Sequence, residues 1–234
     1  MNKIKLGIIG PHGRMGKAMV EEAESDPGIE IVSALVKKDA AVVAKKNWET
    51  ACPETFLSKI DVIADFSNPS SLKSYLGSAV SQKKPLVLGT TGLQKEDRRL
   101  LEDASQEIPV FWSSNFSIGI FMLRRMAKYL LKESGAASIH ILEEHHKSKK
   151  DSPSGTALQI FSELQSGHSN ISIESARKGR TIGKHRIVFD LPEEKLIIEH
   201  QAGSRKIYAK GALRAAKWIC GRPHGLFSME DLLS

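Results

Sequence analysis

Near its N-terminus the chain reads KIKLGIIGPHGRMG (residues 3–16). Residues 3–9 form a short apolar run that ends in glycines, which is typical of a buried parallel strand. Gly10, Gly13 and Gly16 follow with the spacing GxxGxxG, and apolar residues then recur at helical intervals. A strand, a glycine-rich turn and the start of a helix, in this order, predict the phosphate-binding loop of a Rossmann-type domain.

The three glycines suit a dinucleotide for a physical reason. Without side chains, the backbone can turn tightly and approach a pyrophosphate, whose charge meets N–H groups and the positive end of the helix dipole. Glycines also make plain structural turns, so the triplet alone is weak evidence. The strand before the loop and the helix after it favour dinucleotide binding over a bare turn.

The pattern of the first domain continues beyond this loop. Strand-like apolar runs alternate with segments of helical periodicity. The strand-like runs are residues 29–36, 60–66, 85–88 and 110–112, and the helical segments are residues 71–82 and 95–105. This alternation predicts an α/β fold, with an N-terminal Rossmann-type, doubly wound parallel sheet.

The second half of the chain has a different character. Residues 118–131 predict a long apolar-striped helix, and strand-like alternation then dominates. The strand-like segments are residues 138–146, 171–178, 184–191 and 195–201, with one helix at 157–164 and a last helix at 211–220. We expect a second, α+β domain on an open mixed sheet. Residues 1–116 plus 206–234 would form the dinucleotide-binding domain, and residues 117–205 the substrate-binding and oligomerisation domain.

Composition excludes several classes of protein. Of the 234 residues, 41% are hydrophobic and 26% are charged, as in ordinary globular proteins. No run reaches the length of a membrane span, and the apolar opening stops at Gly10, short of a signal peptide. We therefore expect a cytoplasmic protein. Cys52 and Cys220 lie far apart without metal-ligand spacing, so neither a disulfide nor a metal site is predicted.

The net charge of +7 has two readings, a nucleic-acid surface or a pocket for small anions. Only 6% of the residues are aromatic, and they do not interleave with basic residues as a base-stacking surface requires. The composition favours a small anionic ligand and predicts no nucleic-acid or membrane partner.

The end of the second strand bears on the choice of cofactor. An acid there would bind the adenosine ribose hydroxyls of NADH. The chain instead has Lys37 and Lys38, and its first acid is Asp39. Lys37 is placed to meet a 2′-phosphate, which predicts NADPH as the preferred cofactor, with some use of NADH. Two solvated lysines at a strand end are the alternative.

The most informative segment reads EEHHKSKKDSPSGTAL (residues 143–158). His145 and His146 leave a strand, Lys149 follows, and Gly155 and Thr156 open a helix with exposed N–H groups. A histidine pair alone is more often packing or surface, and a lysine run is usually solvated. Together they predict an anion pocket with proton-transfer groups. The chain therefore reads as an enzyme that reduces a small anionic substrate with hydride and a proton.

Four segments of the chain resemble the 4-hydroxy-tetrahydrodipicolinate reductase family. They are GPHGRMG (10–16), GTTG (89–92), NFS (115–117) and HHKSK through SGT (145–156). The likeness runs over essentially the whole chain. It implies NAD(P)H-dependent reduction of a cyclic imine dicarboxylate to tetrahydrodipicolinate, with loss of water, in diaminopimelate and lysine biosynthesis. It also implies a homotetramer formed through the sheet of the second domain.

The resemblance also implies roles for individual residues. His145 would be the proton donor and acceptor, and Lys149 the proton donor. The substrate carboxylate would be held by His146, Gly155 and Thr156. The residues that would line the cofactor are Gly10, Pro11, His12, Gly13, Arg14, Met15, Lys37, Gly89, Thr90, Thr91, Ser113, Ser114, Asn115 and Phe116. Arg205 is a further candidate for contact with the substrate.

The chain departs from the family pattern in two places. Val36 stands where the family often has an acid after the second strand, which puts NADH use in doubt. Residues 169–196 are compact, so loops that shape the family's oligomer are expected to be short.

Two rival functions remain. A semialdehyde dehydrogenase would need a cysteine nucleophile in the second domain, and neither Cys52 nor Cys220 lies there. A non-catalytic NADP-binding sensor would need the glycine loop, but not His145 and Lys149.

Overall fold

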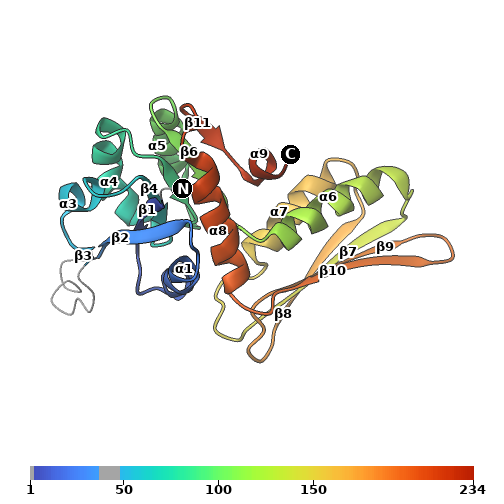
Figure 1. Cartoon of the computed structure of the whole chain (residues 1–234). Helices are drawn as coiled ribbons and strands as arrows, with labels where there is room; N and C mark the ends of the chain where they lie inside the picture. Colours follow the sequence, from blue (N-terminus) through green and yellow to red (C-terminus); the bar gives the residue numbers. More distant parts are fainter. Residues whose placement is uncertain (1–2, 37–47) are drawn as a thin grey trace. The chain divides into compact units, whose positions relative to one another are not determined.

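The computed structural model describes residues 3–36 and 48–234. The chain forms two compact units, of which unit 1 comprises Met1–Phe116 and Tyr208–Ser234, and unit 2 comprises Ser117–Ile207. Figure 1 shows the chain leaving the first unit after β6 and returning to it through α8. No helix in the described part of the chain is long and apolar enough to cross a membrane.

Unit 1 is built on a parallel sheet with the strand order β11-β6-β5-β4-β1-β2-β3. Its strands are β1 (Ile4–Ile9), β2 (Ile29–Leu35), β3 (Glu49–Thr50), β4 (Val62–Asp65), β5 (Leu86–Leu88), β6 (Pro109–Trp112) and β11 (Gly225–Phe227). The chain adds strands on one side of β1 and then on the other, so the order reverses between β1 and β4. The predicted doubly wound parallel sheet is confirmed. Ligands of such sheets bind at the carboxyl ends of the strands near this reversal.

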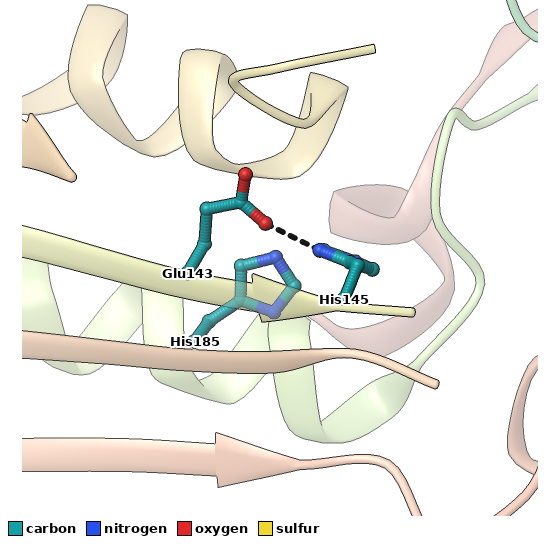
Figure 2. A group of neighbouring side chains, drawn as sticks. All are labelled: Glu143, His145 and His185. Carbon is teal, nitrogen blue, oxygen red and sulfur yellow. Dashed lines mark hydrogen bonds and ion pairs between the residues drawn. The ribbon is translucent and has the colours of Figure 1, made fainter. Parts of the chain in front are cut away.

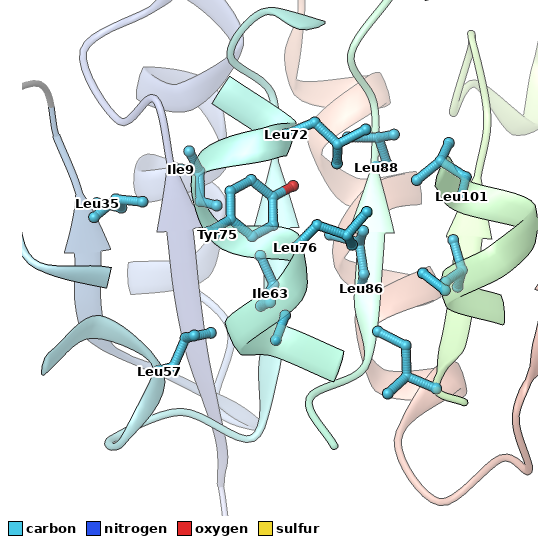
Figure 3. Packing of buried hydrophobic residues seen from close by; sticks show 14 of the residues in the cluster. Ile9, Leu35, Leu57, Ile63, Leu72, Tyr75, Leu76, Leu86, Leu88 and Leu101 are labelled. Atoms are coloured by element: carbon cyan, nitrogen blue, oxygen red, sulfur yellow. The ribbon is translucent and has the colours of Figure 1, made fainter. Parts of the chain in front are cut away.

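Helices cover both faces of this sheet (Figure 1). They are α1 (Arg14–Glu24), α3 (Pro53–Leu57), α4 (Pro69–Ser81), α5 (Lys95–Ser105), α8 (Lys206–Ile219) and the short α9 (Met229–Leu233). On one face, α3, α4 and α5 pack onto the strands through side chains such as Leu57, Leu72 and Leu101 (Figure 3). Each fully buried side chain of this kind stabilises the fold by about 1.5–3 kcal/mol.

Helix α8 begins at Lys206, five residues before the predicted start at Gly211. A glycine inside a helix lowers helix propensity. The structure explains why glycine is present: a Cβ added at Gly211 would lie 1.9 Å from the carbonyl oxygen of Phe116. The helix therefore packs against the backbone of residue 116 at a distance that only glycine allows.

Unit 2 is a four-stranded sheet with the order β10-β9-β7-β8. Its strands are β7 (Ser138–His145), β8 (Ile171–Arg177), β9 (Lys184–Asp190) and β10 (Lys195–Gln201), and its helices are α6 (Ile118–Glu133) and α7 (Gly155–Gln165). Strand β7 pairs parallel with β8 and antiparallel with β9. The predicted open mixed sheet is confirmed.

The helices α6 and α7 pack on one face of this sheet. Every second residue of β7, beginning with Ile139, is buried on that face, as strand geometry requires. Ile139 and Ile141 join Ile160 of α7 and Phe189 of β9 in the core of unit 2. Toward the end of β7 the residues at these buried positions, Glu143 and His145, are polar, and they form part of the candidate site.

Candidate functional site

The glycine loop lies between β1 and α1, where the sequence predicts it. Gly10 has φ +78°, a conformation that favours glycine, and a Cβ at Gly16 would lie 2.0 Å from the carbonyl oxygen of Gly10. Gly13 is the N-cap of α1 and supplies no side-chain cap, and the first turn of α1 carries no acidic residue. This helix start therefore fits a pyrophosphate group.

The other predicted cofactor residues follow neighbouring strands of the same sheet. Residues 89–91 come directly after β5, and residues 113–116 directly after β6. Because the strands are parallel, their carboxyl ends lie at the same edge as the end of β1. The structure thus brings the predicted cofactor segments to one edge of unit 1. Lys37 lies outside the described residues.

Two of these predicted residues turn inward. Phe116 is buried and packs against the rings of Phe66 and Phe111, with centroids 5.5 and 5.7 Å apart. Thr90 is also buried, and its hydroxyl donates a hydrogen bond to Asp65 Oδ1 at 3.4 Å. The side chains of Phe116 and Thr90 therefore pack inside unit 1, beneath the sheet edge that carries the predicted cofactor segments.

Asp65, at the end of β4, is a residue that the sequence analysis missed. It is fully buried and accepts hydrogen bonds from Tyr75 Oη at 2.7 Å and from the N–H of Ser67 at 2.8 Å. Burial raises the pKa of Asp65, although these hydrogen bonds oppose the shift. A side chain at Gly10 would meet the Cβ of Ser67 at 3.0 Å, so Asp65 fixes a turn that borders the glycine loop.

Glu49 of β3 also lies beside the glycine loop. Its Oε2 is 3.3 Å from Nε2 of His12, and its side chain is almost fully buried. This contact could not be predicted from local spacing, because β3 has only two residues and shows no periodicity.

In unit 2, the buried face of the sheet ends in a group of polar side chains from three strands. Glu143 and His145 extend the buried positions of β7, Arg177 ends β8, and His185 lies near the start of β9. The register explains their meeting, since His145 pairs with Arg177 and Glu143 pairs with His185. Glu143, His145 and His185 are drawn in Figure 2.

Glu143 is the centre of this group. Its Oε1 accepts hydrogen bonds from Arg177 Nη2 at 2.8 Å and from the N–H of Ser154 at 3.2 Å, and its Oε2 pairs with His145 Nδ1. Burial alone would raise the pKa of Glu143, but the hydrogen bonds with Arg177 and His145 hold it below its ordinary value. Glu143 is therefore an ionised carboxylate held between the guanidinium of Arg177 and the imidazole of His145.

The two histidines of the group have lowered pKa values. For His145, burial lowers the pKa, and Glu143 opposes that shift. For His185, burial lowers the pKa to about 3, so this imidazole is neutral at physiological pH. The two rings meet edge to face with centroids 5.2 Å apart.

Lys149 lies in the loop between β7 and α7, and its ammonium group is already engaged with a carboxylate. Its Nζ is 2.8 Å from Asp151 Oδ2. Burial works to raise the pKa of Asp151, but Lys149 and a hydrogen bond from the Gly155 backbone hold it below its ordinary value. The ammonium and the helix start therefore bind the same carboxylate group.

The remaining predicted substrate residues lie in the same loop and helix start. His146 is half-buried, and its Nδ1 shares a hydrogen bond of 2.9 Å with Ser148 Oγ. Gly155 and Thr156 are the first two residues of α7, whose N-cap Ser154 accepts a hydrogen bond from the N–H of Ala157. His145, His146, Lys149, Gly155 and Thr156 thus all belong to one end of unit 2.

Metal binding is the alternative use of the buried group. Glu143, His145 and His185 each offer one ligand atom, and these atoms lie within 4.8 Å of one another. However, both oxygens of Glu143 already have partners, one of them the guanidinium of Arg177. A carboxylate that is neutralised by arginine and imidazole fits proton transfer better than it fits a divalent cation.

Comparisons with known proteins agree with this geometry. The family model "Dihydrodipicolinate reductase, N-terminus" matches residues 4–116, and "Dihydrodipicolinate reductase, C-terminus" matches residues 118–233. The 4-hydroxy-tetrahydrodipicolinate reductase of Helicobacter hepaticus is 37% identical over 252 residues, covering 98% of this chain and 99% of the relative. That of Buchnera aphidicola is 36% identical over 266 residues, covering 99% and 97%.

A solved structure shares the whole fold. Dipicolinate-bound dihydrodipicolinate reductase from Paenisporosarcina sp. TG-14 superposes with a TM-score of 0.82 at 22% identity, covering 99% of this chain and 100% of that one. The fold and the glycine loop define a nicotinamide-dinucleotide-dependent oxidoreductase of the Rossmann class. Since both family models together match nearly all of its residues, the chain belongs to the dihydrodipicolinate reductase family.

Proposed function

We propose that the chain reduces 4-hydroxy-tetrahydrodipicolinate to tetrahydrodipicolinate in diaminopimelate and lysine biosynthesis. The substrate, NADPH and one proton would give tetrahydrodipicolinate, NADP⁺ and water. The cofactor supplies the hydride when it is bound at the strand edge of unit 1. Unit 2 would hold the dicarboxylate and move the proton. The chain would act in the cytoplasm, as a homotetramer.

One observation is the main support for the assignment of the substrate site. The carboxylate of Asp151 is held by Lys149 Nζ and by the N–H of Gly155, which begins α7. These are donors that the proposal assigns to a carboxylate of the substrate, with Thr156 and His146 beside them. An internal carboxylate on the same donors supports the view that they suit such a group. His145 would exchange the proton, and Lys149 would also donate one.

The direct test of the function is a coupled assay. The preceding synthase generates the unstable substrate in the cuvette, and the oxidation of NADPH is followed by absorbance. We expect turnover that depends on both the substrate and the chain. If the chain binds NADPH but never oxidises it, the sensor function replaces the proposed one. A semialdehyde substrate in place of the imine tests the other rival.

The same assay tests cofactor preference. We expect a lower KM for NADPH than for NADH, by about 10- to 100-fold, because a hydrogen bond between Lys37 and the 2′-phosphate is charge-assisted. Lys37→Ala should raise the KM for NADPH by this factor and leave the KM for NADH unchanged. Lys38→Ala is the control. A lower KM for NADH in the native chain would contradict the preference.

A second variant tests the substrate site. Asp151→Asn removes the carboxylate that competes for Lys149 and Gly155, so we expect the KM for the substrate to fall by about two- to fivefold. This range corresponds to a partly exposed ion pair worth up to about 1 kcal/mol. Glu174→Gln, an exposed acid on β8, is the matched control for loss of one charge. A rise in KM for Asp151→Asn would show that Asp151 assists substrate binding instead.

A further inference from the structure

A buried carboxylate outside the predicted site contacts the proposed proton-transfer group. We propose that Glu143 is a positioning residue, which holds the Nδ1–H of His145 and leaves Nε2 to exchange the proton with the substrate. This inference rests on the proposed function, since it assigns Nε2 of His145 to the reaction. It adds Arg177 as the residue that holds Glu143 in place.

The strand fixes the pair in position. Glu143 and His145 are two residues apart on β7, so both side chains project from the same face, and both are more than nine-tenths buried. Figure 2 shows the carboxylate of Glu143 directed at one nitrogen of His145. A carboxylate on Nδ1 determines the tautomer of a neutral imidazole, with the proton on Nδ1 and the lone pair on Nε2.

Arg177 and Ser154 hold the carboxylate itself. Both donate to Oε1 of Glu143, so only Oε2 is directed at His145. Arg177 Nη2 also donates to the backbone carbonyl oxygen of Asp151, which ties the guanidinium to the loop that carries Lys149. The carboxylate therefore cannot rotate away from His145 without losing two hydrogen bonds in a buried place, where such a loss is costly.

His185 completes the surroundings of His145. Its ring lies edge to face with that of His145, and its low pKa keeps it neutral. A neutral neighbour neither repels the imidazolium form of His145 nor takes its proton at physiological pH. When His145 gives up its Nε2 proton to the substrate, the Nε2–H bond breaks, a bond from that proton to the substrate forms, and a neutral ring remains, still bonded to Glu143.

The charged and titratable groups that face His145 determine how its activity should depend on pH. Glu143 of β7 stabilises its imidazolium, whereas Arg177 of β8, Lys149 of the following loop and burial destabilise it. His185 of β9 is neutral. Replacing Glu143 by glutamine removes the only stabilising charge among these groups. The pKa of His145 should then fall, and the limb of the pH profile that reports His145 should move to lower pH whether it acts as acid or as base.

The experiment compares Glu143→Gln with Glu144→Gln in the full chain. Glu144 is the adjacent residue on the opposite face of β7, where its Oε1 accepts a hydrogen bond from Thr181. We expect Glu143→Gln to lower kcat by about 10- to 100-fold, with KM changed less than threefold and the pH profile shifted, as for loss of one charge-assisted hydrogen bond. Glu144→Gln should change kcat less than twofold.

A spectroscopic readout separates this proposal from the proposed function. Nitrogen-15 NMR of the histidine rings should show His145 protonated on Nδ1 in the native chain and in Glu144→Gln, and a mixture of tautomers in Glu143→Gln. The NMR result needs no turnover, so it stands even if no variant reduces the substrate. If Glu143→Gln does not fold, Arg177→Gln is the second variant. It should show the same mixture of tautomers, but its pH profile should move to higher pH, because Arg177 destabilises the imidazolium of His145.

Three outcomes would overturn the proposal. Native kcat and an unshifted pH profile in Glu143→Gln would show that the carboxylate has no positioning role. An unchanged Nδ1–H signal would show that the tautomer is set elsewhere. Loss of activity on treatment with a chelator, restored by Zn²⁺, would show that Glu143, His145 and His185 serve a metal ion instead.

Discussion

Replacing His145 by alanine is expected to lower kcat by about 10²- to 10⁴-fold, and Lys149→Ala should do the same. A positioned proton-transfer group contributes about this factor to an enzymatic rate. Water cannot substitute well for His145, because its side chain is buried and bonded to Glu143. Lys149→Ala should in addition raise the KM for the substrate, since its ammonium group is proposed to bind a carboxylate.

The measurement is the coupled assay at saturating NADPH, together with NADPH binding followed by nicotinamide fluorescence. Both variants should bind NADPH as the native chain does, because the cofactor segments lie in unit 1 and these residues in unit 2. Lys150→Ala is the control for loss of an exposed lysine from the same loop, and His140→Ala is the control for a histidine of β7. If both His145→Ala and Lys149→Ala turned over the substrate at the native rate, the assignment of the site would be wrong.

The order of elements in unit 1 could be predicted because its signals are local. Apolar runs, helical spacing and the glycine loop each occupy a few consecutive residues, and parallel topology follows from their alternation. The elements that were missed, β3, α3, β11 and α9, have two to five residues each, too few for periodicity to appear. For α9 a signal did exist, since Ser228 and Asp231 form a capping box.

The candidate site was predictable only in part, for a related reason. His145, His146, Lys149, Gly155 and Thr156 lie within twelve residues, so the sequence displays them together. Glu143 could also have been found, because a residue two positions before His145 on a strand shares its face. The prediction used the histidines, Lys149 and the helix start of this segment, and assigned no role to its acids.

Arg177 and His185 could not have been found in this way. They reach Glu143 and His145 through the pairing of β8 and β9 with β7, and they are 32 and 40 residues away from His145 along the chain. Register between strands depends on packing of the whole sheet and is not encoded in local spacing. The positioning of His145 is therefore a property of the tertiary structure.

Gly16→Ala is expected to have the second large effect, on cofactor binding. An added Cβ would lie 2.0 Å from the carbonyl oxygen of Gly10 and 2.8 Å from the Cα and carbonyl carbon of Pro11. These are backbone atoms of the loop proposed to hold the pyrophosphate, so the loop itself must move. Loss of one hydrogen bond to a charged phosphate would raise the Kd for NADPH by about 10- to 100-fold.

The same overpacking should reduce stability by about 1–3 kcal/mol, which lowers Tm by several degrees in a chain of this size. Gly77→Ala is the matched control, because Gly77 is an exposed residue inside α4 of the same unit and its added Cβ would meet no heavy atom within 4 Å beyond its own stretch of the helix. That variant should gain about 0.5–1 kcal/mol of stability from helix propensity and bind NADPH normally.

Calorimetric titration with NADPH and thermal unfolding of both variants measure these effects. If Gly16→Ala bound NADPH as tightly as Gly77→Ala does, the close approach of α1 to the loop would not be what forms the pyrophosphate site, and dinucleotide binding at this edge would need another explanation.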